Sequence, residues 1–270
     1  MRDARRRQEI KAYYLGISAD EITSYFTPAT FDLWESLGRY RSEHGIGARW
    51  LEVGGGIGDL AAAALDRGYD VLMTDVQPEL LDTAAARHPR LRGRLERSDI
   101  FDPRDVAALA SRGPFSIVAA LGAVLNHARD HRELARGFGH LVALAAPNAL
   151  LTVDVMLREM FPGHPPTIWA DIFHVLPGFD DLARLVRASR LQVLETHSLY
   201  HRYPPTPGFD AEFDERMLRL VLRRPPSDRG AAETTIRSSR RARPDSRRRA
   251  PSPSRDSAGA RPATRRRRRA

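Results

Sequence analysis

The chain has 270 residues, enough for one large α/β domain with a sizeable core, and its apolar content of 42% is slightly low for a chain that folds throughout. It contains no cysteine, which excludes a disulfide framework and thiolate chemistry. No apolar segment follows the basic N-terminus, and no uninterrupted run of about 18 apolar residues occurs. We therefore expect no secretory signal, no transmembrane segment and a cytoplasmic location.

The formal net charge of +9 is distributed unevenly. Residues 226–270 carry 15 arginines and 4 acids, whereas the preceding residues carry 28 basic and 30 acidic groups. The C-terminal segment has one large aliphatic residue, Ile236, and no aromatic residue, so it cannot bury enough surface to fold. We predict a disordered tail over 226–270. Since the rest of the chain is nearly neutral, contact with nucleic acid is expected only through this tail.

Residues 1–48 are predicted to form an N-terminal helical segment. A short helix is expected over 4–14. A second helix begins at Thr27-Pro28, where a threonine N-cap precedes proline at the first helical position, and it ends near Gly45. Residues 49–225 are predicted to form one further domain.

Apolar segments of strand length alternate with segments of helical periodicity through this second domain, and a proline-rich excursion over 158–177 interrupts them. The alternation predicts a doubly wound, mostly parallel, seven-stranded sheet covered on both faces, which is a Rossmann-like α/β fold. We expect strands over 50–53, 69–74, 94–97, 114–120, 150–155, 191–200 and 217–223, and helices over 59–67, 78–88, 130–145 and 179–190, with another starting at Asp102-Pro103.

The first strand–helix–strand unit has the features of a nucleoside site. Gly54 and Gly56 follow the first strand and allow backbone angles that are closed to residues with a Cβ atom. The helix that begins after them directs unpaired N–H groups at the same place. Asp75 ends the second strand, about twenty residues after the first glycine, where an acid suits the two hydroxyls of a ribose.

Acidic residues surround this turn, because Glu52 precedes it, Asp59 follows it and Asp99 follows the third strand. A dinucleotide pyrophosphate would lie beside Glu52 and Asp59, and each like-charge contact at about 4–5 Å costs about 3–4 kcal/mol. The spacing is also G-x-G-x-G, whereas the dinucleotide fingerprint is G-x-G-x-x-G. S-adenosylmethionine, which has a ribose, an adenine and a cationic end, fits this acidic set better than NAD.

The sequence from Glu52 to Gly58 resembles the E/D-x-G-x-G-x-G motif of class I S-adenosylmethionine-dependent methyltransferases. Asp75 matches the family's acid after the second strand. Asp99, with Ile100 beside it, matches the acid that contacts adenine. Residues 120–126, including Leu121, resemble the fourth motif, and residues 146–149 resemble the L-x-P-G-G turn, although Asn148-Ala149 replaces the usual glycine pair. The resemblance covers 49–224 and implies S-adenosylmethionine as cofactor.

The predicted enzyme transfers a methyl group, most simply to a small-molecule acceptor. His127 follows the fourth strand and is a candidate general base, with a surface histidine as the alternative. Asp154 is a weaker candidate, and no metal site is predicted. Two alternatives remain, namely an NAD-dependent oxidoreductase on a similar fold and a non-catalytic nucleoside-binding protein. The oligomeric state is left open. The predicted cofactor-binding residues are Glu52, Gly54, Gly56, Gly58, Asp75, Asp99, Ile100 and Leu121.

Overall fold

The computed structural model describes residues 33–160, 175–203 and 213–226, all within the compact unit that ends at Ser227. The helix predicted over 4–14, the helix start at Thr27-Pro28, most of the excursion over 158–177 and the tail from residue 227 onward lie outside the described residues.

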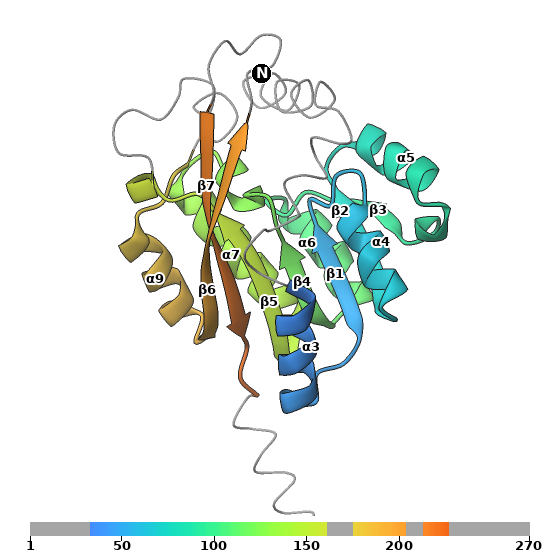
Figure 1. Cartoon of the computed structure of the whole chain (residues 1–270), viewed down its shortest axis with the longest axis horizontal. Coiled ribbons are helices and arrows are strands. Elements are labelled where there is room, and N and C mark those ends of the chain that lie inside the picture. The colour runs from blue at the N-terminus through green and yellow to red at the C-terminus, as the bar shows by residue number, and fades with distance from the viewer. Residues whose placement is uncertain (1–32, 161–174, 204–212, 227–270) are drawn as a thin grey trace, which may run out of the picture. The chain divides into compact units, whose positions relative to one another are not determined.

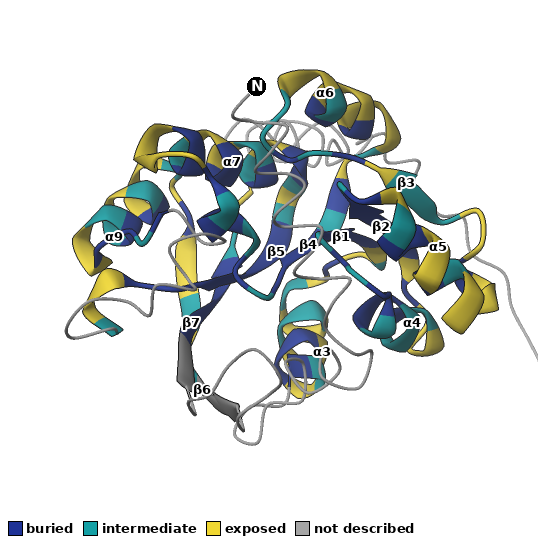
Figure 2. Ribbon diagram, turned by 90° about the horizontal axis from the view of Figure 1, so that it is seen from above, coloured by how far each residue is buried: buried dark blue, intermediate teal, exposed yellow. Residues whose placement is uncertain are grey.

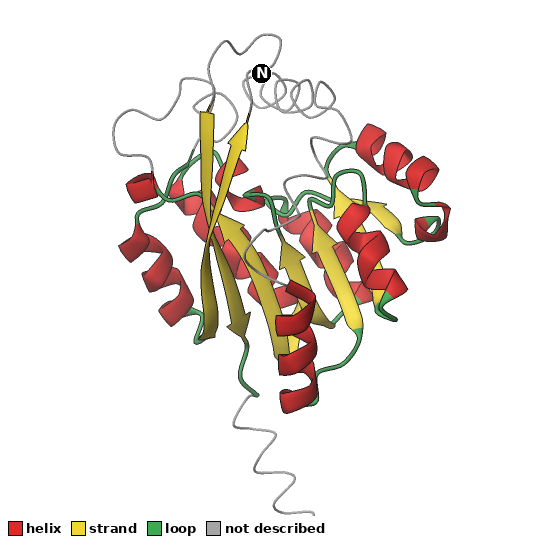
Figure 3. Ribbon diagram, viewed as in Figure 1, coloured by secondary structure: helices red, strands yellow, loops and turns green. Residues whose placement is uncertain are grey.

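A seven-stranded sheet forms the centre of the described unit (Figures 1 and 3), and its strand order is β3-β2-β1-β4-β5-β7-β6. The first five strands are parallel, whereas β7 pairs antiparallel with both β5 and β6. This confirms the predicted mostly parallel sheet. The strands are β1 (Arg49–Val53), β2 (Asp70–Asp75), β3 (Leu95–Arg97), β4 (Phe115–Ala120), β5 (Ala145–Val155), β6 (Gln192–Tyr203) and β7 (Phe213–Arg223).

Helices cover both faces of the sheet, as the doubly wound prediction requires. Seen from above (Figure 2), α3, α4 and α5 lie on one face and α6, α7 and α9 lie on the other. Three short 3₁₀ helices, η1 (Pro89–Leu91), η2 (Val124–His127) and η3 (Arg158–Met160), lie in the connections. The helices are α3 (Leu33–His44), α4 (Asp59–Asp66), α5 (Pro78–Arg87), α6 (Pro103–Arg112), α7 (His131–Leu144) and α9 (Phe179–Ala188).

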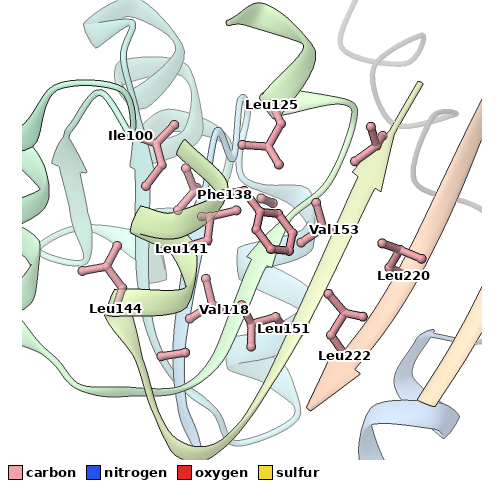
Figure 4. Packing of buried hydrophobic residues seen from close by; sticks show 14 of the residues in the cluster. Ile100, Val118, Leu125, Phe138, Leu141, Leu144, Leu151, Val153, Leu220 and Leu222 are labelled. Atoms are coloured by element: carbon pink, nitrogen blue, oxygen red, sulfur yellow. The ribbon is translucent and has the colours of Figure 1, made fainter. Parts of the chain in front are cut away.

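Each face of the sheet has its own hydrophobic core. On the α7 side (Figure 4), Phe138 and Leu141 pack against apolar side chains of β4, β5 and β7. On the α3 side, the fully buried Trp50 lies 5.7 Å from Trp34, centroid to centroid, and 5.4 Å from Tyr69. Because β1 is buried on both faces, the backbone at its carboxyl end is held firmly in place.

Two of the predicted helix starts have the expected chemistry. The Asp102 carboxylate accepts the Arg104 N–H at 2.9 Å, and Pro103 occupies the first turn of α6. At the start of α7, the Asp130 carboxylate accepts the Glu133 N–H at 2.7 Å. A side chain therefore binds one of the otherwise unpaired N–H groups of each helix.

The strand β5 begins five residues earlier than predicted, at Ala145 instead of residue 150. Ala145 pairs with Phe115 of β4, and a register irregularity before the next pair accommodates the Pro147-Asn148 segment. Asn148 adopts a left-handed backbone with φ of 68°, which asparagine tolerates, and its side-chain amide donates to the His44 carbonyl at 2.7 Å. The strands β6 and β7 also extend beyond the predicted limits, to Tyr203 and from Phe213.

The end of β7 is fastened to the rest of the sheet. Arg223 donates to the Asn148 Oδ1 at 2.9 and 2.8 Å. The Arg224 N–H donates to the Ala149 carbonyl at 2.9 Å, and its guanidinium donates to the Val142 carbonyl at 2.9 Å.

We therefore expect deletion of residues 226–270 to change the free energy of unfolding by less than about 0.5 kcal/mol. Denaturant unfolding measures this change.

A second deletion, of residues 223–270, is the matched control. It removes the bonds of both arginines and should unfold at clearly lower denaturant concentration. Equal stability losses in the two truncated chains would show that the tail itself stabilises the domain.

Candidate functional site

The candidate site lies at the carboxyl ends of the four adjacent strands β3, β2, β1 and β4. The strand order reverses between β1 and β4, and ligands of open parallel sheets bind at such a switch point. The turn after β1 contains three glycines with left-handed backbones, since φ is 69° at Gly54, 56° at Gly56 and 85° at Gly58. Only glycine adopts this conformation without a steric penalty.

The three glycines differ in what a side chain would meet. A Cβ atom on Gly54 would lie 2.6 Å from the Val124 Cγ2 atom, and one on Gly58 would lie 2.9 Å from the Leu91 Cδ1 atom. A Cβ atom on Gly56 would meet no described atom within 4 Å. Gly54 and Gly58 therefore allow close packing of the protein itself, while Gly56 borders open space that a ligand could fill.

Asp75 joins the glycine turn to the end of β2. It is 6% exposed, and its two carboxylate oxygens accept the N–H of Gly56 at 3.0 Å and the N–H of Gln77 at 2.9 Å. Burial raises the pKa of Asp75, and the backbone hydrogen bonds oppose that rise. Each carboxylate oxygen has two lone pairs, so the group retains the capacity to accept hydroxyl donors from a ligand.

Glu52 is buried in β1 with 4% exposure, and its Oε2 atom has no hydrogen-bond partner among the described residues. Burial, together with the negative charges of Asp75 and Asp59, raises the pKa of Glu52 to about 8, although the Trp50 side chain lowers it. The carboxyl group is therefore protonated near neutral pH. A buried acid with an unpartnered oxygen suits a cationic ligand group, whose charge would lower this pKa and favour the carboxylate form.

Asp59 is not the uncompensated charge that the sequence suggested. Its carboxylate lies 2.6 Å from the His88 Nε2 atom and 2.9 Å from the Arg87 Nε atom, both at the end of α5. Because Asp59 is paired and Glu52 is uncharged when protonated, the case against a pyrophosphate now depends mainly on the glycine spacing. Sequence inspection missed these partners because they lie nearly thirty residues further along the chain.

The segment after β3 forms the next wall of the site. The Asp99 Oδ1 accepts the Phe101 N–H at 2.9 Å, and the Asp99 N–H donates to the Asp105 carboxylate at 2.8 Å. Ile100 is buried, and its carbonyl lies 2.7 Å from the His140 Nδ1 atom. Asp99 is thus fixed at the position that the resemblance assigns to adenine recognition.

Two polar residues that the sequence analysis did not single out lie beside the predicted acids. Gln77 Oε1 and Ser98 Oγ are buried and have no hydrogen-bond partner in the part of the chain that the structure describes. Gln77 follows Asp75 by two residues, and Ser98 directly precedes Asp99 and donates its N–H to the Asp75 carbonyl at 3.0 Å. Buried polar groups are usually paired, so these two oxygens are candidates for contact with a ligand. Their closeness in sequence to Asp75 and Asp99 is the signal that could have identified them.

The loop after β4 closes the site on its other side. Leu121 is buried, and Val124 contacts the glycine turn as described above. The fully buried Asn126 donates its amide to the carbonyls of Met156 at 2.9 Å and Val175 at 2.7 Å, and accepts the Met156 N–H at 2.9 Å. His127 is half-buried at the end of η2. Asn126 thus anchors the loop on which the candidate base lies.

Residues 51–151 match a family model described as a methyltransferase domain. No curated protein matches the chain. Among solved structures, the N-methyltransferase NodS from Bradyrhizobium japonicum WM9, in complex with S-adenosyl-L-homocysteine, is 16% identical with a TM-score of 0.56, over 81% of this chain and 97% of NodS.

A second similar structure comes from work on the conversion of a disulfide bond into a thioacetal group during echinomycin biosynthesis, with 16% identity, a TM-score of 0.54, and coverage of 76% of this chain and 87% of the other. An S-adenosylmethionine-dependent methyltransferase from Clostridium acetobutylicum ATCC 824 is 14% identical with a TM-score of 0.50, over 74% and 94% of the two chains. These likenesses show the fold. The family-model match identifies residues 51–151 as similar to a methyltransferase domain.

Proposed function

We propose that this methyltransferase transfers the methyl group of S-adenosylmethionine to a small-molecule acceptor, with the cofactor bound at the carboxyl ends of β1, β2 and β3. The observation that carries the proposal is the arrangement around the glycine turn. Gly56 borders open space, the Asp75 carboxylate holds the Gly56 N–H, and the buried Glu52 oxygen has no partner within the described residues.

Each end of the cofactor has a proposed partner. The Asp75 carboxylate would accept the ribose hydroxyls, and Glu52 would bind the ammonium group of the methionine part. Asp99 and Ile100 would contact the adenine, with Gln77 and Ser98 as further polar contacts. Gly54, Gly58 and Leu121 would shape the surface on which the cofactor lies.

Bound S-adenosylmethionine supplies an activated methyl group for in-line transfer to a nucleophile. The protein would contribute mainly alignment of the acceptor and exclusion of water. A base is needed only if the acceptor must lose a proton, and His127 at the end of η2 is our candidate for that proton transfer.

A small acceptor is favoured over nucleic acid by charge. Residues before 226 carry 28 basic and 30 acidic groups, whereas a groove that follows phosphates should be basic. The NodS structure contains S-adenosyl-L-homocysteine, which is the product expected of the same cofactor.

Within the ranges that the structure describes, no helix is long and apolar enough to cross a membrane.

Titration calorimetry with S-adenosylmethionine, S-adenosylhomocysteine and NAD tests the cofactor site. We expect the first two to bind and NAD not to bind. A screen of small amines and hydroxy compounds, with S-adenosylhomocysteine release as readout, then tests the acceptor class. Methylation of nucleic acid or protein, without turnover of any small acceptor, would contradict the acceptor part of the proposal.

The Asp75→Ala variant should weaken S-adenosylhomocysteine binding by about 1.5–3 kcal/mol, because charge-assisted hydrogen bonds to the ribose are lost. Calorimetry on the folded variant measures this change. Asp70→Ala is the matched control, since Asp70 begins the same strand at the opposite end and is exposed. An unchanged dissociation constant for Asp75→Ala would refute the ribose assignment.

The Gly56→Ala variant should lose cofactor binding while it remains folded. Gly68→Ala is its control, because Gly68 also has a positive φ of 79° and a Cβ atom added there would meet no described atom within 4 Å. Backbone strain should destabilise both variants by roughly 1–2 kcal/mol. Thermal melts and calorimetry separate this shared strain from the loss of ligand space. Equal affinities in the two variants would contradict a ligand contact at Gly56.

The Glu52→Gln variant should be more stable than the wild type in the absence of cofactor, yet bind S-adenosylhomocysteine more weakly. The pKa of Glu52 in the folded protein, about 8, is raised above its ordinary value of 4.5, so the contribution of Glu52 to stability is present below pH 4.5 and is lost as the pH rises to 8. The stability difference should grow across this window by on the order of a few kcal/mol.

Denaturant unfolding at several pH values measures the effect, with Glu96→Gln on the edge strand β3 as control. A pH-independent stability difference between Glu52→Gln and the wild type would show that Glu52 is not protonated in the folded protein.

A further inference from the structure

A buried ion pair joins β5 and β7 near the carboxyl end of β5. Asp154 and Arg219 are direct cross-strand neighbours and are each 1% exposed. The Arg219 Nε donates to the Asp154 Oδ1 at 2.7 Å, and its Nη2 donates to Oδ2 at 2.8 Å. Replacing such a pair by apolar residues of similar volume is often neutral or stabilising. Stability alone is therefore a weak reason for its presence.

The Asp154 carboxylate accepts a third hydrogen bond, since its Oδ2 accepts the Gly122 N–H at 3.1 Å. Gly122 begins a turn with two consecutive left-handed residues, with φ of 70° at Gly122 and 59° at Ala123. Ala123 is fully buried, and a left-handed alanine costs roughly 1–2 kcal/mol. Such a backbone persists only where its surroundings hold it, and the hydrogen bond from Gly122 to Asp154 is one such restraint.

The next residue of this turn is the one that contacts the glycine loop. The Val124 Cγ2 atom lies 2.6 Å from where a Cβ on Gly54 would be, so Val124 packs directly against the Gly54 backbone. Leu121, at the start of the turn, is buried in the same core as Trp50. The position of the turn therefore sets the surface behind the glycine loop.

We propose that Asp154 is a positioning residue. Its carboxylate, whose charge Arg219 compensates, holds the turn over residues 121–124 against the glycine loop and so shapes the cofactor site. The consequence for cofactor affinity rests on the proposed function, whereas the restraint on the turn does not. Asp154 reaches the site only through Gly122, and this distinguishes it from residues that touch the ligand.

The test compares the double variant Asp154→Leu/Arg219→Met with the wild type. The exchange removes both charges at similar volume, so the sheet should remain folded, while the Gly122 N–H loses its acceptor. Thr152→Val is the matched control, because Thr152 is a buried residue two positions away on β5 whose hydroxyl has no hydrogen-bond partner among the described residues. Thermal melts, hydrogen exchange of a peptide covering residues 121–127 and calorimetry with S-adenosylhomocysteine are the readouts.

We expect the double variant to melt near the wild-type temperature, to exchange faster over 121–127 and to bind S-adenosylhomocysteine about tenfold more weakly. Thr152→Val should match the wild type in all three measurements. A folded double variant with wild-type exchange and affinity would overturn the proposal. If the double variant does not fold, Asp154→Val/Arg219→Leu takes its place. It also removes both charges and the acceptor of the Gly122 N–H, so unchanged exchange over 121–127 in that variant would overturn the proposal equally.

The two proposals fail in different ways. A wild-type protein that binds no S-adenosylhomocysteine would refute the cofactor site, while the exchange comparison over 121–127 would still decide whether Asp154 restrains the turn.

Discussion

The arrangement of the candidate site depends on one carboxylate, that of Asp75. Parallel pairing of β1 with β2 places Val53 opposite Thr74, so both strands end at the same level. There the Asp75 oxygens bind the N–H of Gly56 in one loop and the N–H of Gln77 in the next. Burying a charge is costly, and these N–H donors offset part of the cost. The two loops are thus held together before any ligand binds, which is the preorganisation that tight binding needs.

The site nevertheless departs from what would make the fold most stable. Glu52 is an acid within a buried strand, and Ala123 has a backbone conformation that favours glycine. Neither feature improves the packing of the sheet, and both lie where the loops after β1 and β4 meet. Local departures of this kind concentrate at functional sites, where the rest of the structure compensates for them. The large apolar cores on the two faces of the sheet provide that compensation here.

The fold and the glycine turn could be predicted from the sequence because their signals are local. Alternating apolar segments indicated the sheet, and glycines next to strand-end acids marked the turn. The extra length of β5 could not be predicted, because Ala145 becomes a strand residue only by pairing with Phe115. The compensation of Asp59 by Arg87 and His88, the packing of Val124 on Gly54 and the pairing of Asp154 with Arg219 all join residues distant in sequence. Such contacts depend on how the elements pack, which no local pattern specifies.

Glu52 and Asp154 are two buried acids of the sheet that differ in the partners the chain gives them. Their side chains lie on the same face of the sheet, since each continues the alternation of a strand that buries Trp50 or Leu150 there. Asp154 receives two donors from Arg219 and one from Gly122, so the chain itself supplies its partners. Glu52 keeps an unpartnered oxygen, and burial raises its pKa to about 8. A cation from outside is what would complete its environment, and the ammonium group of S-adenosylmethionine has the required charge. The acid that the fold leaves incomplete is therefore the one that we assign to the cofactor.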